Sequence, residues 1–144
     1  MNLVLLFKED FISSSRVQLS DSRRDHIAQT LKSKLGDQIT VGLCDGKLGK
    51  GTVVQVGNSV ILDVVLNQTP PEALPLTLIL ALPRPHMFKR TLSFATSFGI
   101  KKIIILNFNR VEKSLWNSST LRPEVIKEQL VLEIEEHTSE LQSL

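Results

Sequence analysis

The sequence predicts an α/β protein in which a small β-barrel domain precedes the first part of an α/β domain. Three observations support this prediction. Short strand-like runs alternate with turn residues over the first 70 residues. Three prolines then occur within residues 70–75. Beyond them, two continuous apolar runs flank a segment with helical spacing, which is the pattern of a parallel βαβ unit.

The composition is that of a folded protein. The chain has 144 residues, of which 42% are hydrophobic, and this is too apolar for a disordered chain. No apolar run approaches the roughly 20 residues of a membrane helix, and no export signal is recognisable, so we expect no membrane association and a cytoplasmic location. The single cysteine agrees with a reducing compartment. One cysteine and three scattered histidines have no metal-ligand spacing, so we expect no metal site.

The first domain is expected over residues 1–70. A strand at residues 3–7 is followed by a helix capped by Ser20 or Asp21. The apolar residues of that helix recur every four positions, at Ile27, Leu31 and Leu35. Gly36 is well placed to end the helix.

Three further runs in this domain have the character of strands, at residues 38–44, 51–56 and 59–66. Asp45-Gly46 and Gly57-Asn58 separate them and tolerate a positive φ. We therefore predict an antiparallel meander that curls into a small barrel to protect its edges.

A proline-rich linker at residues 71–75 leads to the second domain, residues 76–144. Residues 76–82 predict a strand buried on both faces, residues 87–98 a helix, and residues 103–106 a second buried strand. Pro123 is well placed to begin a last helix. The apolar stripe of this helix is Ile126, Leu130, Ile134, Leu141 and Leu144.

Charge is unevenly distributed along the chain. Residues 71–122 contain eight Lys or Arg against two Asp or Glu, which is +6, whereas residues 123–144 contain one against six, which is −5. A basic segment of this kind indicates a polyanionic partner, although a solvated surface would have the same composition.

The basic residues of the second domain follow the two predicted strands. Because the carboxyl ends of parallel strands meet at one sheet edge, these cations should converge there. The predicted RNA-binding residues are Arg84, Lys89, Arg90, Arg110 and Lys113. Folding alone does not favour cations at the start of a helix, so a phosphate ligand would offset their cost. Trp116 could stack on a base or pack in the core, and the sequence does not decide between these roles.

No catalytic residue can be identified from spacing. His86 could act in acid–base chemistry, but no carboxylate lies near it in the sequence. The segment from Asp45 to Gly51 is glycine-rich and basic, yet it lacks the order of a phosphate-binding loop.

At the level of motifs, the chain resembles the RsmE-type 16S rRNA uridine-N3 methyltransferases of the SPOUT superfamily. The resemblance covers about residues 1 to 132. In the first domain it depends on residues 26–32, on Gly36-Asp37-Gln38-Ile39 and on Cys44-Asp45-Gly46. In the second it depends on residues 78–83, on the helix around residues 87–99 and on residues 110–116.

The resemblance implies a PUA-like RNA-binding barrel followed by the first βαβα part of a SPOUT-like domain. It also implies S-adenosylmethionine as cofactor, a homodimer, and 16S rRNA or the small ribosomal subunit as partner. In that family the cofactor site is a C-terminal knot with glycine-rich loops, and this sequence has no glycine after Gly99. We therefore expect catalytic residues outside this chain, and expect the chain alone neither to bind the cofactor nor to be active.

Three interpretations of the function remain at this point. The first is a methyltransferase lineage that methylates a uridine N3 in 16S rRNA. The second is a truncated, non-catalytic RNA-binding fragment. The third is a protein-interaction domain whose exposed half-sheet pairs with a partner.

Overall fold

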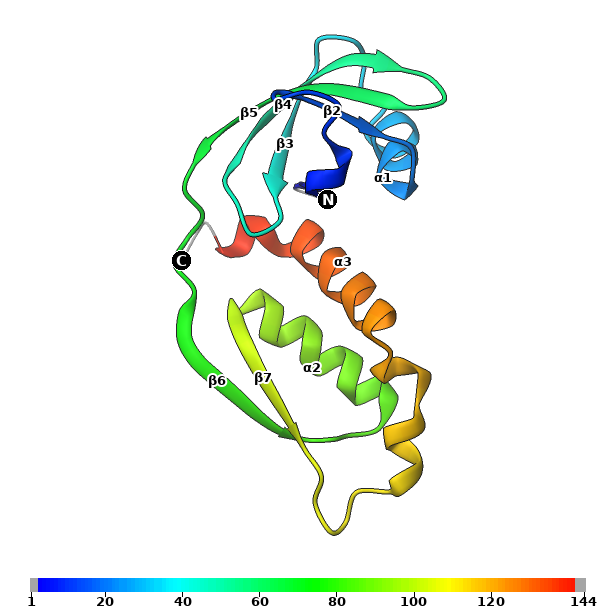
Figure 1. The fold of residues 1–144 in the computed structure, drawn as a ribbon, viewed down its shortest axis with the longest axis vertical. Coiled ribbons are helices and arrows are strands. Elements are labelled where there is room, and N and C mark those ends of the chain that lie inside the picture. The colour runs from blue at the N-terminus through cyan, green and yellow to red at the C-terminus, as the bar shows by residue number, and fades with distance from the viewer. Residues whose placement is uncertain (1–2, 142–144) are drawn as a thin grey trace. The chain divides into compact units, whose positions relative to one another are not determined.

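The computed structural model describes residues 3–141, with side chains described for residues 3–135. The chain divides into two compact units, Met1–Pro70 and Pro71–Leu144. Figure 1 shows the elements of each unit along the chain. The α/β class with a barrel-like first part is confirmed by this architecture.

Unit 1 is built on a curled five-stranded sheet in the order β1-β3-β4-β5-β2. The strands are β1 (Val4–Leu6), β2 (Arg16–Leu19), β3 (Gln38–Leu43), β4 (Leu48–Val56) and β5 (Val60–Gln68). The sheet is mixed, since β1 runs parallel to β3 while the other pairs are antiparallel. The predicted antiparallel meander of three strands is confirmed as β3, β4 and β5, and the sheet also includes β1 and β2, for which no pairing was predicted.

Strand β2 was not predicted, because four residues carry too weak an alternation to stand out. Its burial nevertheless alternates, with Val17 and Leu19 facing the core. It pairs with β5 and forms the second edge of the sheet, so the barrel is an open one. Branched aliphatic side chains fill the core, and Val17, Val41, Val60 and Leu62 are fully buried there.

Gly49 shows why the sheet can curl as tightly as it does. A Cβ atom on this residue would lie 1.8 Å from the carbonyl oxygen of Val65 on the neighbouring strand. The register of β4 and β5 shifts at the same place, between Leu48 and Gly49. A glycine is needed here because the two backbones approach too closely for any side chain.

The predicted helix of unit 1 is shorter than expected. Asp21 caps it as predicted, accepting a hydrogen bond from the backbone N–H of Arg23 at 3.0 Å. However, α1 covers only Ser22–Asp25 and continues as one wide π-type turn, η2 (His26–Thr30). Ile27 is buried, whereas Leu31 and Leu35 are exposed, because the chain leaves the helix at Lys32, whose φ is +51°.

A buried arginine joins the helix to the start of the chain. The Arg23 guanidinium donates to both carboxylate oxygens of Asp10, at 2.7 and 2.8 Å, and to the carbonyl oxygen of Leu5 at 2.7 Å. It also pairs with Asp21 at 2.6 Å and lies over the Phe7 ring, 5.4 Å from its centroid. Burial opposes the charge, but the hydrogen bonds that Arg23 donates to Asp21 and Asp10, with the attraction of the two carboxylates, outweigh it and raise the pKa of Arg23.

Unit 2 contains two parallel strands, β6 (Leu74–Ala81) and β7 (Ile100–Leu106), joined through helix α2 (Pro85–Ser97). Two short 3-10 turns follow, η3 (Lys113–Asn117) and η4 (Ser119–Leu121), and then helix α3 (Pro123–Leu141). Pro85 occupies the first turn of α2, and Gly99, with φ +71°, ends that helix.

Strand β6 begins two residues earlier than predicted, inside the expected linker of residues 71–75. Pro75 is accommodated because the ladder is interrupted there, passing directly from the pair Leu74 and Ile100 to the pair Thr77 and Lys102. Proline has no N–H to donate, and the irregularity removes the need for one.

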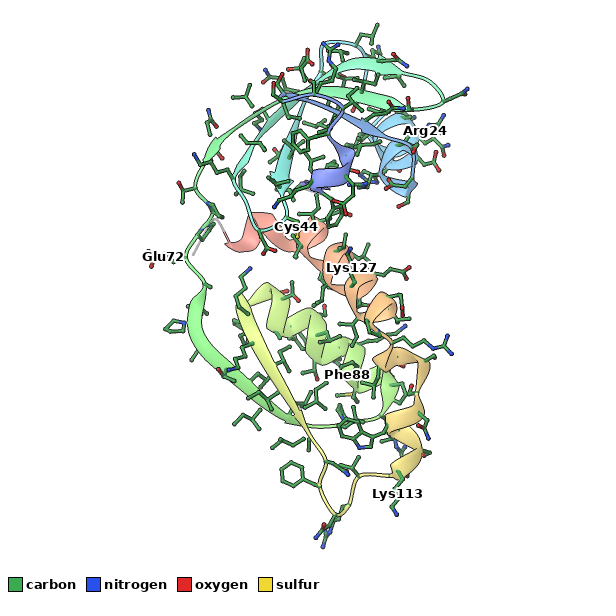
Figure 2. The ribbon with its side chains drawn as sticks, viewed as in Figure 1. Arg24, Cys44, Glu72, Phe88, Lys113 and Lys127 are labelled. Atoms are coloured by element: carbon green, nitrogen blue, oxygen red, sulfur yellow. The ribbon has the colours of Figure 1, made fainter. Side chains whose placement is uncertain are left out.

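Helix α2 packs on one face of the β6–β7 pair. Phe88 and Leu92 from α2 are buried together with Leu82, and Figure 2 labels Phe88 on this helix. Ile126 and Leu130 of α3 join this core as predicted. Ile134 is half-buried, while Leu141 and Leu144 lie outside the residues with described side chains.

The opposite face of the two strands is open, which contradicts the prediction of strands buried on both faces. Ile79 is 62% exposed and lies beside Ile104 in the register, which is 37% exposed. Continuous apolar sequence does not by itself distinguish the two faces of a strand, so only the packing of α2 shows which face is covered. In the described part of the chain, no helix is long and apolar enough to cross a membrane.

Candidate RNA interface

The carboxyl ends of β6 and β7 meet at one edge of unit 2. Ala81 lies opposite Leu106 in the register, and the next residue, Leu82, donates its backbone N–H to the carbonyl oxygen of Leu106 at 3.2 Å. The segments after both strands therefore leave from the same edge. We refer to this region, with its five predicted RNA-binding residues, as the basic edge.

Three of the five cations come from the segment after β6. Arg84 is the N-cap residue of α2, and Lys89 and Arg90 follow in its first turns. All three side chains are exposed. Arg84 makes no side-chain capping bond, so its guanidinium does not serve the helix that it precedes. Positive charge at a helix N-terminus opposes the helix dipole, and these residues are therefore not explained by helix stability.

The other two cations come from the segment after β7. Arg110 and Lys113 are exposed, and Figure 2 labels Lys113 in the segment that follows β7. Between them, Val111 packs against the core of unit 2 and donates its N–H to the carbonyl oxygen of Phe108 at 2.9 Å. This anchor holds the loop while its charged side chains stay in solvent. Glu112 is also exposed here and is the acidic residue of the segment.

Side-chain partners separate the basic edge from the arginines of unit 1. Arg16, Arg23 and Arg24 each form a salt bridge within their own unit. Among the side chains that the structure describes, those of residues 3–135, Arg84, Lys89, Arg110 and Lys113 form no hydrogen bond or salt bridge. Arg90 differs from these four because its guanidinium lies 5.5 Å from the centroid of the Phe94 ring. The basic edge thus presents uncompensated positive charge to solvent.

Two exposed aromatic side chains also lie in the segment after β7. Phe108 is 52% exposed and Trp116 is 38% exposed. Sequence reasoning left the role of Trp116 open and did not consider Phe108. Its position in the sequence could have indicated exposure, because Phe108 continues the every-second-residue pattern of Ile104 and Leu106 beyond the end of β7.

The remaining candidate residues do not form a catalytic group. His86 is exposed in the first turn of α2. His26 is half-buried, its Nε2 atom has no hydrogen-bond partner in the described structure, and burial lowers its pKa. Cys44 is half-buried and is the single cysteine of the sequence. No cluster of three metal-ligating side chains exists among the described residues.

Comparison with known proteins agrees with the motifs. Residues 70–132 match the RNA methyltransferase domain family. The chain is 27% identical over 139 residues to ribosomal RNA small subunit methyltransferase E of Treponema pallidum, and 26% identical over 123 residues to methyltransferase E 1 of Borreliella burgdorferi. The chain is similar to the RsmE-type RNA methyltransferases. These alignments cover 94% and 85% of this chain but only 52% and 51% of the relatives, so the chain spans about half of their length.

Solved structures of RsmE-type proteins share the fold. The methyltransferase E of Neisseria gonorrhoeae, solved with S-adenosyl methionine, superposes with a TM-score of 0.72 at 17% identity, covering 93% of this chain and 56% of that one. A putative methyltransferase of Legionella pneumophila, solved with bound SAM, gives 0.66 at 13% identity, covering 96% and 59%. These likenesses establish the fold.

The residues at the basic edge do not fit the cofactor of these relatives. S-adenosylmethionine has a sulfonium, an ammonium group and one carboxylate, and the charged side chains at this edge are mainly cations, which provide no counter-charge for its net positive charge. Phosphate groups, in contrast, are attracted to the same arrangement.

Proposed function

We propose that this chain binds ribosomal RNA through the basic edge, and that it comes from a methyltransferase lineage whose reaction is the N3 methylation of a uridine in 16S rRNA. One observation carries the proposal: five exposed cations follow two strand ends that meet at one edge, and four of them have no side-chain partner among the described residues. The names of its relatives support the RNA class and the reaction. The partner is 16S rRNA or the small ribosomal subunit, and the compartment is the cytoplasm.

The role of each residue follows from its position. Arg84 and Lys89 flank the start of α2, where backbone N–H groups add to their attraction for phosphate. Arg110 and Lys113 reach phosphates from the neighbouring loop. These contacts position RNA without reading its sequence. The catalytic residues and the S-adenosylmethionine site of this reaction belong to a part of the fold that the two described strands do not supply.

The test is RNA binding as a function of salt. If about four phosphates are contacted, log affinity for single-stranded RNA should fall against log salt with a slope of roughly −3. Replacing Arg84, Lys89, Arg110 and Lys113 with Ala should flatten that slope. Fluorescence anisotropy of a labelled oligonucleotide measures both quantities.

A matched control is available on β7 itself. Lys101 and Lys102 are exposed at the amino end of the strand, away from the basic edge. The double variant Lys101→Ala/Lys102→Ala removes the same charge as Arg110→Ala/Lys113→Ala, but only the second should reduce the slope. Equal effects from the two variants would show that overall charge, rather than the basic edge, attracts RNA.

A protein-interaction domain is the second candidate, and the uncovered face of β6 and β7 favours it. Ile79, Ile104 and Leu106 are exposed together on that face. Steep salt dependence of RNA binding supports the first function, because apolar association strengthens rather than weakens as salt rises. A homodimer through this face is compatible with either function.

A further inference from the structure

The exposed aromatic side chains in the segment after β7 point to a more specific ligand. We infer that Phe108 and Trp116 are base-stacking platforms, so that the basic edge binds single-stranded RNA in preference to duplex RNA. This inference rests on the proposed function and adds the class of RNA. It assigns a binding role to two residues outside the phosphate-contacting set.

The first argument is position. Phe108 and Trp116 flank Arg110 and Lys113 in the sequence, so aromatic and cationic side chains share one short segment. Proteins that bind single strands combine these two groups, with cations following the backbone and rings stacking on the bases.

The second argument is how the segment is held. Val111 and Leu115 pack against the core of unit 2, and Leu115 donates its backbone N–H to the carbonyl oxygen of Glu112 at 3.0 Å. The backbone is therefore anchored between the two aromatic residues. Phe108 is 52% exposed and Trp116 is 38% exposed, so each ring retains area for a ligand. Because the backbone between them is already ordered, less conformational entropy is lost when bases stack on the rings.

The third argument concerns duplex RNA. In a duplex the faces of the bases are already stacked on one another, so none is available to Phe108 or Trp116, while the phosphates remain accessible to the basic edge. Both forms of RNA should therefore bind with a similar salt dependence, while only the single strand gains from stacking.

The chain provides its own spectroscopic probe. It has one tryptophan and no tyrosine, so intrinsic fluorescence comes mainly from Trp116. Titration with an oligouridine should quench this emission, and the quenching curve should follow the affinity measured by anisotropy. A duplex of the same length should bind with little quenching. RNA binding by both forms without any quenching would overturn the inference and leave the proposed function standing.

Variants of Phe108 separate stacking from apolar packing. Phe108→Ala should weaken single-strand binding by about tenfold, with duplex binding and the salt slope unchanged. Phe108→Tyr should restore the affinity, and Phe108→Leu should not, because leucine is apolar but has no ring. Full affinity in the Leu variant would show that Phe108 belongs to the uncovered apolar face instead.

A control aromatic residue lies at the other end of helix α2. Phe98 is 61% exposed after the last turn of that helix, away from the basic edge. Phe98→Ala should leave single-strand affinity unchanged, and a loss equal to that of Phe108→Ala would contradict a localised stacking site. Absence of salt-dependent RNA binding altogether would overturn the proposed function and this inference with it.

Discussion

At the scale of single residues, the surroundings of each cation distinguish structure from function. Arg23 is enclosed by Asp10, Asp21 and the Leu5 carbonyl group, and its side chain is only 10% exposed. Arg84 and Arg110 are exposed and form no salt bridge among the described residues. The first arrangement stabilises a fold, whereas the second leaves charge for a ligand. The same residue type therefore has opposite roles in the two units.

We predict that Arg23→Ala strongly destabilises unit 1. Removing one partner of a buried ion pair leaves the carboxylate of Asp10 without compensation, at a cost of ~3–5 kcal/mol. Arg16→Ala is the matched control, because its pair with Asp63 is exposed and such pairs contribute ~0–1 kcal/mol. Hydrogen exchange of the backbone amides of β4 and β5 measures the loss of stability in both variants. Equal effects of the two substitutions would show that burial of Arg23 adds nothing.

At the scale of elements, helix α2 has two faces with different roles. Phe88, Leu92 and Ala95 are buried on one face, while Met87, Phe94 and Phe98 are exposed at other positions. Phe88 lies four residues before Leu92 on the buried face, and it packs α2 against the strands. The start of the same helix carries Arg84 and Lys89. Packing of α2 therefore also positions three of the five cations of the basic edge.

Phe88→Ala should destabilise unit 2 by ~3–5 kcal/mol, because it removes a fully buried aromatic side chain and leaves a cavity. Phe98→Ala, an identical substitution at an exposed position, should change stability by less than ~0.5 kcal/mol. Urea unfolding followed by Trp116 fluorescence reports on unit 2, where this tryptophan lies. A stable Phe88→Ala variant would mean that the core of unit 2 is not organised around this ring.

At the scale of the whole chain, the two units differ in how completely they enclose apolar residues. Unit 1 buries a continuous core of branched aliphatic side chains under its curled sheet. Unit 2 covers one face of two strands and leaves Ile79 and Ile104 exposed on the other. The RsmE-type relatives are about twice as long as this chain.

We predict that the 144-residue chain binds S-adenosylmethionine weakly or not at all, and does not transfer methyl groups to RNA. The cations of the basic edge provide no counter-charge for the net positive charge of the cofactor, and two parallel strands provide few of the loops that enclose a nucleoside. Isothermal titration with the cofactor, and methyl transfer from labelled cofactor to small-subunit RNA, test this directly. Micromolar binding or measurable transfer would contradict it and would place a working cofactor site within these residues.

Much of the fold follows from local pattern. The strands β3, β4 and β5, the helices α2 and α3, and the βαβ connection were predicted close to their observed bounds. Pro85, Gly99 and Pro123 define helix ends through their own backbone chemistry, which requires no tertiary information. The adjacent ends of β6 and β7, which Arg84 and Arg110 follow, were also predicted from sequence, because parallel strands place their carboxyl ends together.

The sequence by itself determined the element types, the order of the two units, the relation to RsmE-type proteins and the candidate cations. Only the tertiary structure decided which strands pair with one another and which residues are buried. It paired β1 with β3 in parallel, added β2 as an edge, and ended α1 before Leu31. It also showed that one face of β6 and β7 is open and that Phe108 and Trp116 are exposed. The reason is physical: backbone preference and hydrophobic period are local, whereas strand pairing and burial depend on residues distant in the sequence.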